Sequence, residues 1–395
     1  MNENDSQILA GMLERDGYEP APDKNHADIV IVNTCTVRES ADRKAYGYLW
    51  ELNKIKKNNP ALKIVVAGCL AESEKETILK KLPFVDDVMG VLKYKECLPI
   101  KRSAGVSAFV TAMFGCNQFC SFCIVPFVRG REKSRPIDAI VDEVKNLDKS
   151  QIKEITLLGQ KIDAYGKDIG ASFDKLLYEL NKIDGIERIR FFTSYPTDIT
   201  DEIIDAVAEL PHVCEYFHIP LQSGDDKILR DMNRGYNMRD YSEVVSKIRE
   251  KIPDCAITSD LIVGFPGETE ENFGNSINAV QNMDFDSVIT AMYSSRDGTV
   301  AAKMEAQISD LIKKDRLNRL NKVVEEVALK KNQKLVGSVQ EVLVESAPEP
   351  NRSGSGQCMG RTRTNKIVKF ESEAKTGELV NVKIDRATAW TLYGK

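Results

Sequence analysis

The stretch "GCNQFCSFCIVPFVRGREKSRP", residues 115–136, contains Cys116, Cys120 and Cys123 in the spacing C-x3-C-x2-C. A metal site closed by protein normally takes four ligands, so three thiolates on one short loop leave a coordination position open. Such a loop can hold three irons of a 4Fe-4S cube and leave the fourth iron without a protein ligand. The spacing therefore indicates a catalytic rather than a structural metal centre.

The open iron would be a Lewis acid that chelates an amine together with a carboxylate. The methionine end of S-adenosylmethionine (SAM) carries both groups. One electron from the cluster would then split the sulfonium and release a 5'-deoxyadenosyl radical. The alternative is a structural zinc with a distant fourth ligand, for which His218 is the candidate. Zinc sites, however, usually pair two C-x2-C knuckles.

The composition is that of an ordinary cytosolic protein. A chain of 395 residues exceeds what one core usually organises, so we expect two or three domains. No run of about 18 apolar residues appears, which argues against a membrane span, and the acidic N-terminus lacks the apolar part of a signal peptide. Nine cysteines in a reducing compartment favour metal binding or catalysis over disulfides. Because the net charge is -5, any contact with RNA must come from local patches.

Six strand-like apolar runs follow one another through the middle of the chain, and amphipathic helical segments lie between most of them. Such repeats form barrels of parallel strands, and six are too few for the eight-stranded form, so we predict a partial (β/α)6 barrel. Active sites in these folds lie at the C-terminal ends of the strands, and the cysteine stretch directly follows the first run. The runs are residues 108–113, 154–158, 188–193, 215–221, 256–265 and 286–293.

The segments on either side of this barrel have different patterns. Residues 1–100 alternate amphipathic helices with short β-branched runs, which predicts a doubly wound parallel sheet in an α/β fold. This segment opens on a helix, with no strand before it. A long amphipathic helix over residues 309–335 precedes a series of short strands, which predicts a small all-β barrel at the C-terminus. We therefore predict three domains, at 1–100, 107–335 and 336–395.

Longer motifs around the cysteines resemble a known family. C-x3-C-x2-C with Phe122 before the last cysteine resembles the signature of radical SAM enzymes. The continuation "IVPFVRGREKSRP" and the stretches "LLGQKIDAYGKD", "HIPLQSGDDKILRDMNRGY" and "DLIVGFPGETEENF" resemble the methylthiotransferase branch. Within it, "GQKIDAYG" and "GRTRTNKIV" are similar to the tRNA 2-methylthio-N6-dimethylallyladenosine synthases. The resemblance covers essentially the whole chain and implies an N-terminal methylthiotransferase domain and a C-terminal TRAM RNA-binding domain.

The resemblance implies a second 4Fe-4S cluster in the N-terminal domain, held by three further cysteines. Cys35 and Cys69 match two of them, and each follows a predicted strand at the edge where open α/β sheets bind ligands. Taken alone, each could be a small buried hydrophobe. The third family cysteine belongs to a "GCQMN" element that would lie just before Met1. We therefore expect the chain as printed to lack this ligand and the strand before the first helix. Cys97 follows no predicted strand end.

The resemblance also implies SAM contacts at the ends of the barrel strands. We expect contacts to the methionine amine after the second run, to ribose or carboxylate after the fourth, and to adenine from the backbone of "GFPGE". Arg234 suits a bidentate contact to the carboxylate, whereas His212 and His218 are expected to be structural. Singly, these residues also suit ordinary turns, but they recur at one edge. The expected contacts are Phe122, Gly159, Gln160, Thr193, Ser194, Gln222, Ser223, Arg234, Gly264, Pro266 and Gly267.

Two basic stretches are candidate RNA contacts. Residues 129–135 lie beside the predicted radical site and would steer tRNA phosphates, with a solvated loop as the alternative. Residues 351–370 contain no acid. That stretch favours an RNA-backbone surface, with protective charge on an edge strand as the alternative. The candidate contacts are Arg129, Arg131, Arg135, Arg361, Arg363 and Lys366.

The family implies a tRNA substrate whose adenosine 37, next to the anticodon, already carries an N6-isopentenyl group. Its C2–H bond is replaced by C2–S–CH3, and a radical is needed because no acid or base readily deprotonates that carbon. We expect two 4Fe-4S clusters and SAM as cofactors, a flavodoxin- or ferredoxin-type electron donor, and a cytoplasmic monomer without a membrane partner. Alternatives are action on threonylcarbamoyl-adenosine in tRNA, action on a ribosomal-protein aspartate, or a non-catalytic iron-sulfur RNA-binding protein.

Overall fold

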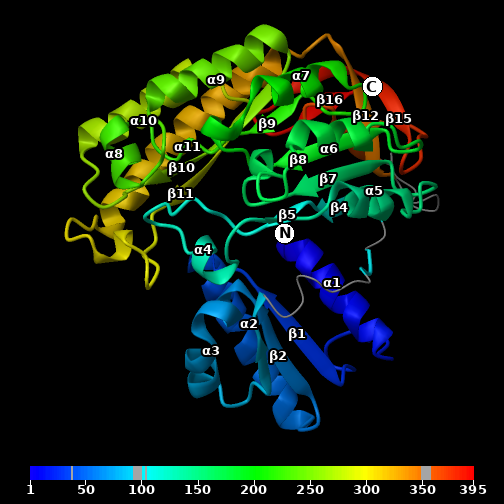
Figure 1. The fold of residues 1–395 in the computed structure, drawn as a ribbon, viewed down its shortest axis with the longest axis vertical. Helices are drawn as coiled ribbons and strands as arrows, with labels where there is room; N and C mark the ends of the chain where they lie inside the picture. Colours follow the sequence, from blue (N-terminus) through cyan, green and yellow to red (C-terminus); the bar gives the residue numbers. More distant parts are fainter. Residues whose placement is uncertain (37–38, 92–99, 103–104, 348–356) are drawn as a thin grey trace. The chain divides into compact units, whose positions relative to one another are not determined.

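The computed structural model describes residues 1–36, 39–91, 100–102, 105–347 and 357–395 (Figure 1). The chain divides into two compact units. The cysteine stretch groups with the N-terminal segment, although in sequence it lies within the predicted central domain. The three predicted domains stay a prediction. The first unit comprises Met1–Ala104, Phe114–Glu132 and Arg296–Thr299, and the second Gly105–Met113, Lys133–Ser295 and Val300–Lys395.

A parallel sheet of order β1-β2-β3 lies in the first unit. Parallel in-register pairing joins Thr34 to Gly68 at the C-terminal ends of β1 and β2. The strands are short and rich in valine and isoleucine, as expected for a sheet that is buried on both faces. The elements are α1 (Asn2–Arg15), β1 (Ile29–Thr34), α2 (Glu39–Asn58), β2 (Lys63–Gly68), α3 (Cys69–Lys81) and β3 (Asp87–Met89).

Helices cover both faces of this sheet. Alternate residues of a strand point to opposite faces. Val32 and Val66 belong to the cluster that contains apolar residues of α2 and α3, whereas Ile31 and Ala67 pack with residues of α1. The N-terminal segment is thus a parallel α/β sheet with helices on both sides, as predicted.

Six parallel strands of the second unit follow one another in chain order, which confirms the predicted partial barrel. They form two three-stranded sheets, β4-β7-β8 and β9-β10-β11. A parallel bridge between Ile189 and Val213 links β8 to the segment before β9. The strands are β4 (Ser107–Thr111), β7 (Glu154–Leu158), β8 (Arg188–Phe192), β9 (Tyr216–His218), β10 (Ala256–Val263) and β11 (Ser287–Met292).

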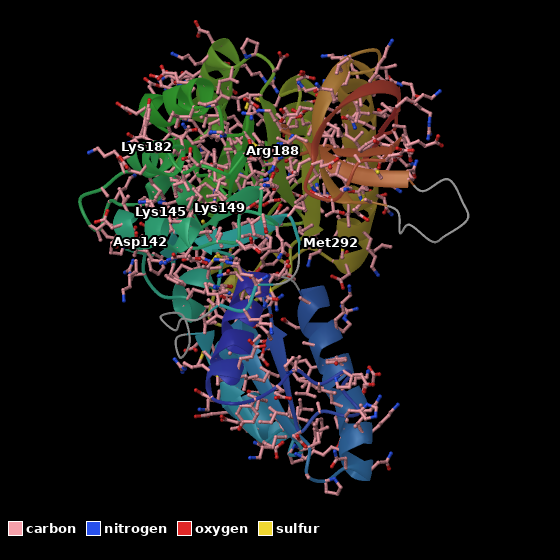
Figure 2. The ribbon with its side chains drawn as sticks, turned by 90° about the vertical axis from the view of Figure 1, so that its right-hand side faces the viewer. Asp142, Lys145, Lys149, Lys182, Arg188 and Met292 are labelled. Atoms are coloured by element: carbon pink, nitrogen blue, oxygen red, sulfur yellow. The ribbon has the colours of Figure 1, made fainter. Side chains whose placement is uncertain are left out.

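Amphipathic helices separate these strands. Asn237 and Thr269 begin α9 and α10 with reciprocal capping boxes, which satisfy backbone N–H groups that have no partner within the helix. Exposed cations such as Lys145 and Lys182 lie on the outside, whereas Arg188 is buried (Figure 2). The helices are α5 (Ile137–Lys145), α6 (Phe173–Leu180), α7 (Asp201–Glu209), α8 (Asp226–Asp231), α9 (Met238–Lys251), α10 (Glu270–Asn282) and α11 (Asp310–Gln333).

Aromatic rings occupy part of the barrel core. Phe191 of β8 makes edge-to-face contacts with Phe173 and Phe217, with ring centroids 5.2 and 5.3 Å apart, and such geometry adds to the stabilisation from burial. Several shorter elements lie in the connections between these strands and helices. They are β5 (Met113–Phe114), α4 (Val125–Val128), β6 (Lys133–Ser134) and the 3-10 turns η2 (Ile162–Ala164), η3 (Pro196–Asp198) and η4 (Ala301–Lys303).

The chain ends in a closed barrel of order β12-β13-β14-β16-β15, which confirms the predicted all-β segment. Val344, Val368, Phe370 and Leu392 are among the residues that fill it. Within the described ranges, no helix combines the length and the apolar character that crossing a membrane requires. The strands are β12 (Val339–Ser346), β13 (Gln357–Thr362), β14 (Ile367–Glu371), β15 (Leu379–Ala387) and β16 (Leu392–Gly394).

Candidate iron-sulfur and cofactor sites

The cysteine stretch forms a loop whose two ends are held together. The backbone N–H of Cys116 donates to the carbonyl of Gly130 at 3.1 Å. Gly115 has a φ of 71°, and a Cβ at this position would clash with the carbonyl of Arg131. Glycine is therefore required where the loop begins, because it adopts this conformation and admits the second chain segment without strain.

The three thiols of this loop suit a cluster rather than a single ion. Cys120 is buried, and Cys116 and Cys123 are half-buried. Across the described part of the chain, no three His, Cys, Asp or Glu side chains are grouped to hold one metal ion. In a 4Fe-4S cube each cysteine binds a different iron, so its ligands need not converge on one point. The donor type and the closed loop therefore fit the cube.

Cys35 and Cys69 lie at the C-terminal edge of the N-terminal sheet. Cys35 follows β1 and Cys69 opens α3 directly after β2, so the pairing of Thr34 with Gly68 places them at neighbouring strand ends. Gly68 has a φ of 94°, and a Cβ there would clash with the Thr34 carbonyl. Burial raises the pKa of the Cys69 thiol. Cys97 lies outside the described residues.

Arg129 connects the cysteine loop to Cys69 within the first unit. Its Nε donates to the Sγ of Cys69 at 3.3 Å, and its Nη2 donates to the Oδ2 of Asp5 at 2.6 Å. Val128 at the end of α4 packs against Cys69 in the same apolar cluster. The loop that would hold one cluster thus contacts a residue that would hold the other.

This position gives Arg129 partners within the protein, and its predicted contact with RNA stays a prediction. Its side chain is buried and its charge is paired with Asp5, so the guanidinium is not presented to a phosphate in solvent. Arg131 lies over the ring of Phe119 at 4.3 Å, and Arg135 pairs with Glu143 at 2.6 Å. For these two arginines the RNA contact stays a prediction.

Three predicted SAM contacts at the ends of successive barrel strands have buried acceptor atoms without a hydrogen-bond partner among the described residues. They are Gln160 Oε1 after β7, Ser194 Oγ after β8 and Gln222 Oε1 after β9. Thr193 and Gln222 each have a φ of 72°, a conformation that non-glycine residues rarely adopt outside turns and functional sites. Because an unpaired buried acceptor is costly, this edge fits a ligand with hydrogen-bond donors, such as the ammonium and hydroxyl groups of SAM.

The other predicted SAM contacts occupy turns at the same strand ends, apart from Arg234, which follows α8, and Phe122, which lies half-buried in the cysteine loop of the first unit. Gly159 follows β7, and Ser223 is fully buried beyond β9. After β10, Gly264 and Gly267 have φ values of 72° and 80° on either side of Phe265 and Pro266. All of these contacts stay predictions.

Arg234 is held by aromatic rings. Its guanidinium lies 4.5 Å from the ring of Tyr195 and 5.1 Å from that of Tyr236, and its Nη2 donates to the carbonyl of Pro220 at 3.0 Å. These contacts fix the plane of the guanidinium, and its contact with the SAM carboxylate stays a prediction.

The histidines have protein partners. His218 Nδ1 lies 2.9 Å from Thr258 Oγ1, and its Nε2 lies 3.3 Å from Asp260 Oδ2. His212 Nδ1 lies 3.3 Å from the carbonyl of Glu187. These contacts support the structural role expected for both.

Sequence reasoning missed a buried charged cluster in the turn after β7. Lys161 Nζ pairs with Asp198 Oδ2 at 2.7 Å, and the Oδ2 of Asp163 accepts a hydrogen bond from the backbone of Tyr195 at 2.6 Å. The only available signal was the motif "GQKIDAYG", which shows charged residues at a strand end but not their burial.

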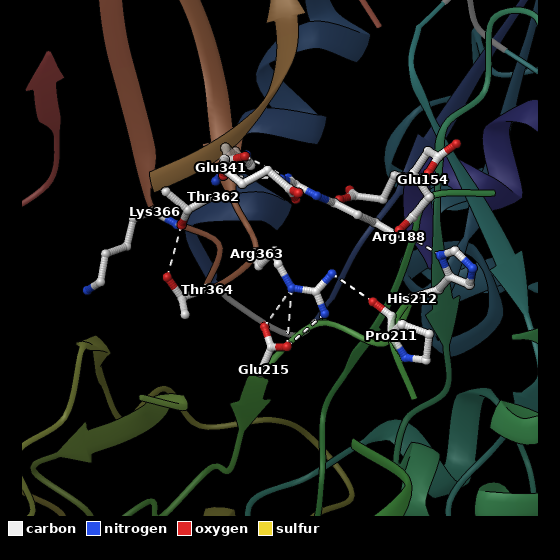
Figure 3. A network of polar contacts seen from close by, with 12 residues as sticks. Glu154, Arg188, Pro211, His212, Glu215, Glu341, Thr362, Arg363, Thr364 and Lys366 are labelled. Carbon is white, nitrogen blue, oxygen red and sulfur yellow. Dashed lines mark hydrogen bonds and ion pairs between the residues drawn. The ribbon is translucent and has the colours of Figure 1, made fainter. Parts of the chain in front are cut away.

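Two of the predicted RNA contacts of the C-terminal barrel, Arg363 and Lys366, pair with carboxylates outside that barrel. Arg363 makes a bidentate contact with Glu215 and also donates to the carbonyls of Pro211 and Val213 (Figure 3). Lys366 pairs with Asp286 at 2.7 Å. Both half-buried cations are therefore engaged within the second unit, and their RNA contact stays a prediction.

Two arginines of β8 donate to backbone carbonyls of the C-terminal barrel, including that of Arg361. Arg361 pairs with Glu345 of the same barrel at 3.1 Å, and its RNA contact stays a prediction. Arg188 donates to the carbonyls of Arg361 and Glu341 (Figure 3). Arg190 donates to two further carbonyls of the β13–β14 turn at 2.6 Å.

The fold and the cysteine loop define the class of the protein. The description "Radical SAM superfamily" matches residues 110–280, "Uncharacterized protein family UPF0004" matches 1–90, and "TRAM domain" matches 333–395. The structure is similar to the radical SAM methyltransferase TsrM from Kitasatospora setae, with a TM-score of 0.58 and 14% identity over 89% of this chain and 78% of that one. The chain has the fold of a radical SAM protein.

Its sequence relatives give the family. The chain is 45% identical to the tRNA-2-methylthio-N(6)-dimethylallyladenosine synthase of Clostridium botulinum (strain Okra / Type B1), over 100% of this chain and 94% of that protein. It is also 45% identical to the protein of that name from Caldicellulosiruptor saccharolyticus, over 100% of this chain and 90% of that protein. The chain belongs to the family of the tRNA-2-methylthio-N(6)-dimethylallyladenosine synthases.

Proposed function

We propose that the protein methylthiolates C2 of N6-isopentenyladenosine at position 37 of tRNA, with SAM and two 4Fe-4S clusters as cofactors. Besides the family, one structural observation carries this proposal. The loop with Cys116, Cys120 and Cys123 shares a compact unit with Cys35 and Cys69, and Arg129 on that loop contacts Cys69. A reaction that couples a radical to sulfur insertion needs these two cysteine sets near each other.

The cysteines and the polar residues at the strand ends have different roles in this proposal. Cys116, Cys120 and Cys123 hold the cluster that, when bound with SAM, supplies the electron for cleaving the sulfonium. The unpaired acceptors of Gln160, Ser194 and Gln222 would bind SAM donors and orient the cofactor at the strand ends. Their burial excludes water, which would otherwise compete for the same hydrogen bonds.

The substrate must reach this edge as an exposed base. Adenosine 37 leaves its stack in the anticodon loop, as bases do in enzymes that act on them chemically, and its apolar isopentenyl group distinguishes it from unmodified adenosine. We place the protein in the cytoplasm, where hypomodified tRNA is found, and propose a flavodoxin- or ferredoxin-type reductant and a monomeric enzyme.

The test is mass spectrometry of nucleosides from isopentenylated, methylthio-free tRNA after incubation with the anaerobically reconstituted chain, SAM and a reductant. The expected product is N6-isopentenyladenosine with a methylthio group, together with 5'-deoxyadenosine. The matched control replaces Cys116, Cys120 and Cys123 by alanine and should yield neither. A methylthio group found instead on threonylcarbamoyl-adenosine would assign the other tRNA substrate, and absence of 5'-deoxyadenosine would favour the non-catalytic alternative.

A further inference from the structure

We propose that the inner face of the sheet β9-β10-β11 selects the substrate base. In this proposal Asp260 accepts a hydrogen bond from the N6–H of the adenine, and Ile289 contacts the isopentenyl group on the same nitrogen. The inference rests on the proposed function and deepens it, because it names the side chains that would distinguish the isopentenylated base from plain adenosine.

Burial separates the two faces of this sheet. Successive residues of a strand point to opposite faces, and Ile257, Leu261 and Val288 belong to the core cluster that includes the surrounding helices. Thr290 donates to Asn321 of α11 at 2.5 Å, so its side of β11 faces that helix. The opposite, inner face is open, whereas the interior of a closed barrel is filled by side chains. Its residues, half-buried or exposed, are Thr258, Asp260, Ile262, Ile289 and Ala291.

Hydrogen bonds between neighbouring side chains hold the Asp260 carboxylate on this face. The hydroxyl groups of Tyr216 and Thr258 lie 2.7 Å apart, and Thr258 Oγ1 lies 2.9 Å from His218 Nδ1. His218 Nε2 in turn lies 3.3 Å from Asp260 Oδ2. The Asp260 side chain is 31% exposed. A carboxylate has two acceptor oxygens, so it can accept a further hydrogen bond from a ligand.

Asp260 also lies beside the strand end where SAM is expected. The backbone N–H of Gln222, a predicted SAM contact after β9, donates to the carbonyl of Asp260 at 2.8 Å. A base that bonds to Asp260 would therefore lie next to the cofactor, which the proposed reaction requires.

Ile289 provides an apolar surface next to this carboxylate. The register of β10 and β11 pairs Asp260 with Ile289 and Ile262 with Ala291, and neighbouring strands are about 4.8 Å apart. Ile289 is 47% exposed, and covering it with an apolar group of a ligand is favourable.

N6-isopentenyladenosine matches this pair of side chains. Its N6 carries both one hydrogen and the branched apolar chain, so donor and apolar group diverge from a single atom. An acceptor on one strand and an isoleucine on the next can therefore meet both at once. Adenosine offers only the donor, and a purine without N6 offers neither.

The first experiment measures selectivity for the isopentenyl group. The anaerobically reconstituted full chain is titrated with a fluorescent anticodon stem-loop RNA that carries either N6-isopentenyladenosine or adenosine at position 37. Ile289→Ala should lower the ratio of the two affinities about tenfold, the lower end of what one methylene contributes in an apolar pocket. Ile312→Ala is the matched control, because it removes an isoleucine of α11 that is 44% exposed, and should leave the ratio unchanged.

The second experiment tests the hydrogen bond to N6. The unsubstituted chain should bind the adenosine stem-loop about tenfold more tightly than one with purine riboside, because a hydrogen bond to a charged group contributes about that much. Asp260→Ala should abolish this preference. If that variant does not fold, Asp260→Asn keeps the shape and should reduce the preference, since a neutral acceptor makes a weaker bond.

Two results would overturn the proposal. One is an unchanged isopentenyl selectivity in Ile289→Ala, and the other is an unchanged preference for adenosine over purine riboside in the Asp260 variant that folds. Both would leave the proposed function standing as long as the unsubstituted chain prefers the isopentenylated stem-loop. Equal binding of isopentenylated and unmodified stem-loops by the unsubstituted chain would instead contradict the proposed substrate itself, and this inference with it.

Discussion

Asp163 is a buried carboxyl group in the turn after β7, 4% exposed. Its Oδ2 accepts the Tyr195 backbone N–H, and within the described part of the chain its Oδ1 has no hydrogen-bond partner. Burial raises the pKa of Asp163 well above its ordinary value of 3.8, and the negative charge of Asp198 acts in the same direction. The folded state therefore binds a proton that the unfolded chain releases at lower pH.

This pKa shift predicts how stability depends on pH. The contribution of protonated Asp163 is fully present below pH 3.8, the ordinary value, and is lost as pH rises through the raised folded-state pKa. Asp163→Asn keeps the acceptor for Tyr195 and carries no charge at any pH. The free energy of unfolding of this variant should fall less between about pH 4 and about pH 8 than that of the unsubstituted chain.

Urea unfolding at both pH values measures this difference. Asp142→Asn, which changes an exposed carboxylate of α5 (Figure 2), is the control and should leave the pH dependence as it was. Equal pH dependence in Asp163→Asn and the unsubstituted chain would show that Asp163 is ionised in the folded protein.

Single residues also show what a sequence can reveal. The cysteines and the polar residues after the barrel strands were predictable because motif and strand end coincide in the sequence. The burial of Arg129 was not, because its partner Asp5 lies 124 positions away. The same holds for Arg363 and Glu215, which are separated by 148 positions. A basic stretch looks the same in sequence whether its charges meet solvent or a distant carboxylate.

At the scale of elements, β8 shows a similar ambiguity. Its sequence alternates Arg188 and Arg190 with Ile189 and Phe191, the pattern of a strand with one face in solvent. In the structure both faces are buried, because the arginines meet backbone carbonyls of the C-terminal barrel. Periodicity predicted the strand correctly. It could not show that the C-terminal barrel covers the polar face of this strand.

The pairing of Arg190 with Glu154, at 2.7 Å and with both side chains buried, predicts a large effect of removing one partner. Arg190→Met leaves the Glu154 charge without compensation and should lower the free energy of unfolding by about 3–5 kcal/mol. Adding Glu154→Gln should restore part of the loss. Lys182→Met, whose pairing with Glu179 is exposed, should cost less than about 1 kcal/mol.

Chemical denaturation of the unsubstituted chain, Arg190→Met, Arg190→Met with Glu154→Gln, and Lys182→Met measures these differences. If Arg190→Met cost no more than Lys182→Met, the buried pair between β7 and β8 would contribute no more to stability than an exposed pair. If Glu154→Gln restored none of the free energy of unfolding, the loss would not come from the unpaired charge of Glu154. It would then come from the lost hydrogen bonds of Arg190 to the carbonyls of Thr362 and Arg363.

The C-terminal barrel was only partly predictable for a related reason. The runs that became β12, β14 and β15 have alternating apolar residues, whereas β13 mixes glycine with polar residues and β16 has only three residues. The barrel closes through a parallel pairing of β14 with β16, and no hairpin signal marks such a pairing. Closure depends on the whole segment, which local pattern cannot show.

At the scale of the whole molecule, a net charge of -5 has to be reconciled with a polyanionic substrate. Arg129, Arg363 and Lys366 each pair with a carboxylate, so we expect other cations to supply most of the attraction. The outer face of the C-terminal barrel provides a row across three strands. Register pairs Tyr393 of β16 with Lys369 of β14 and with Arg386 of β15.

This row combines charge with an aromatic surface. The Arg386 guanidinium lies 3.6 Å from the centre of the Tyr393 ring, and Trp390 in the adjoining turn is 52% exposed. Cations beside aromatic rings are typical of surfaces that bind single-stranded RNA, where phosphates meet the cations and bases stack on the rings. We therefore expect this row to contact the anticodon loop.

The salt dependence of tRNA binding tests this expectation. Each phosphate contact releases counterions, so replacing Lys369 and Arg386 by alanine should weaken binding and reduce the slope of log affinity against log salt by about 2. Arg239→Ala, which removes an exposed cation of α9, should leave the slope unchanged. Fluorescence anisotropy with labelled tRNA between about 50 and about 200 mM salt gives both slopes. An equal slope for the double variant and the unsubstituted chain would exclude these cations from the contact. The slope decides, because a change in slope requires fewer neutralised phosphates, whereas weaker binding alone could arise from a disturbed barrel.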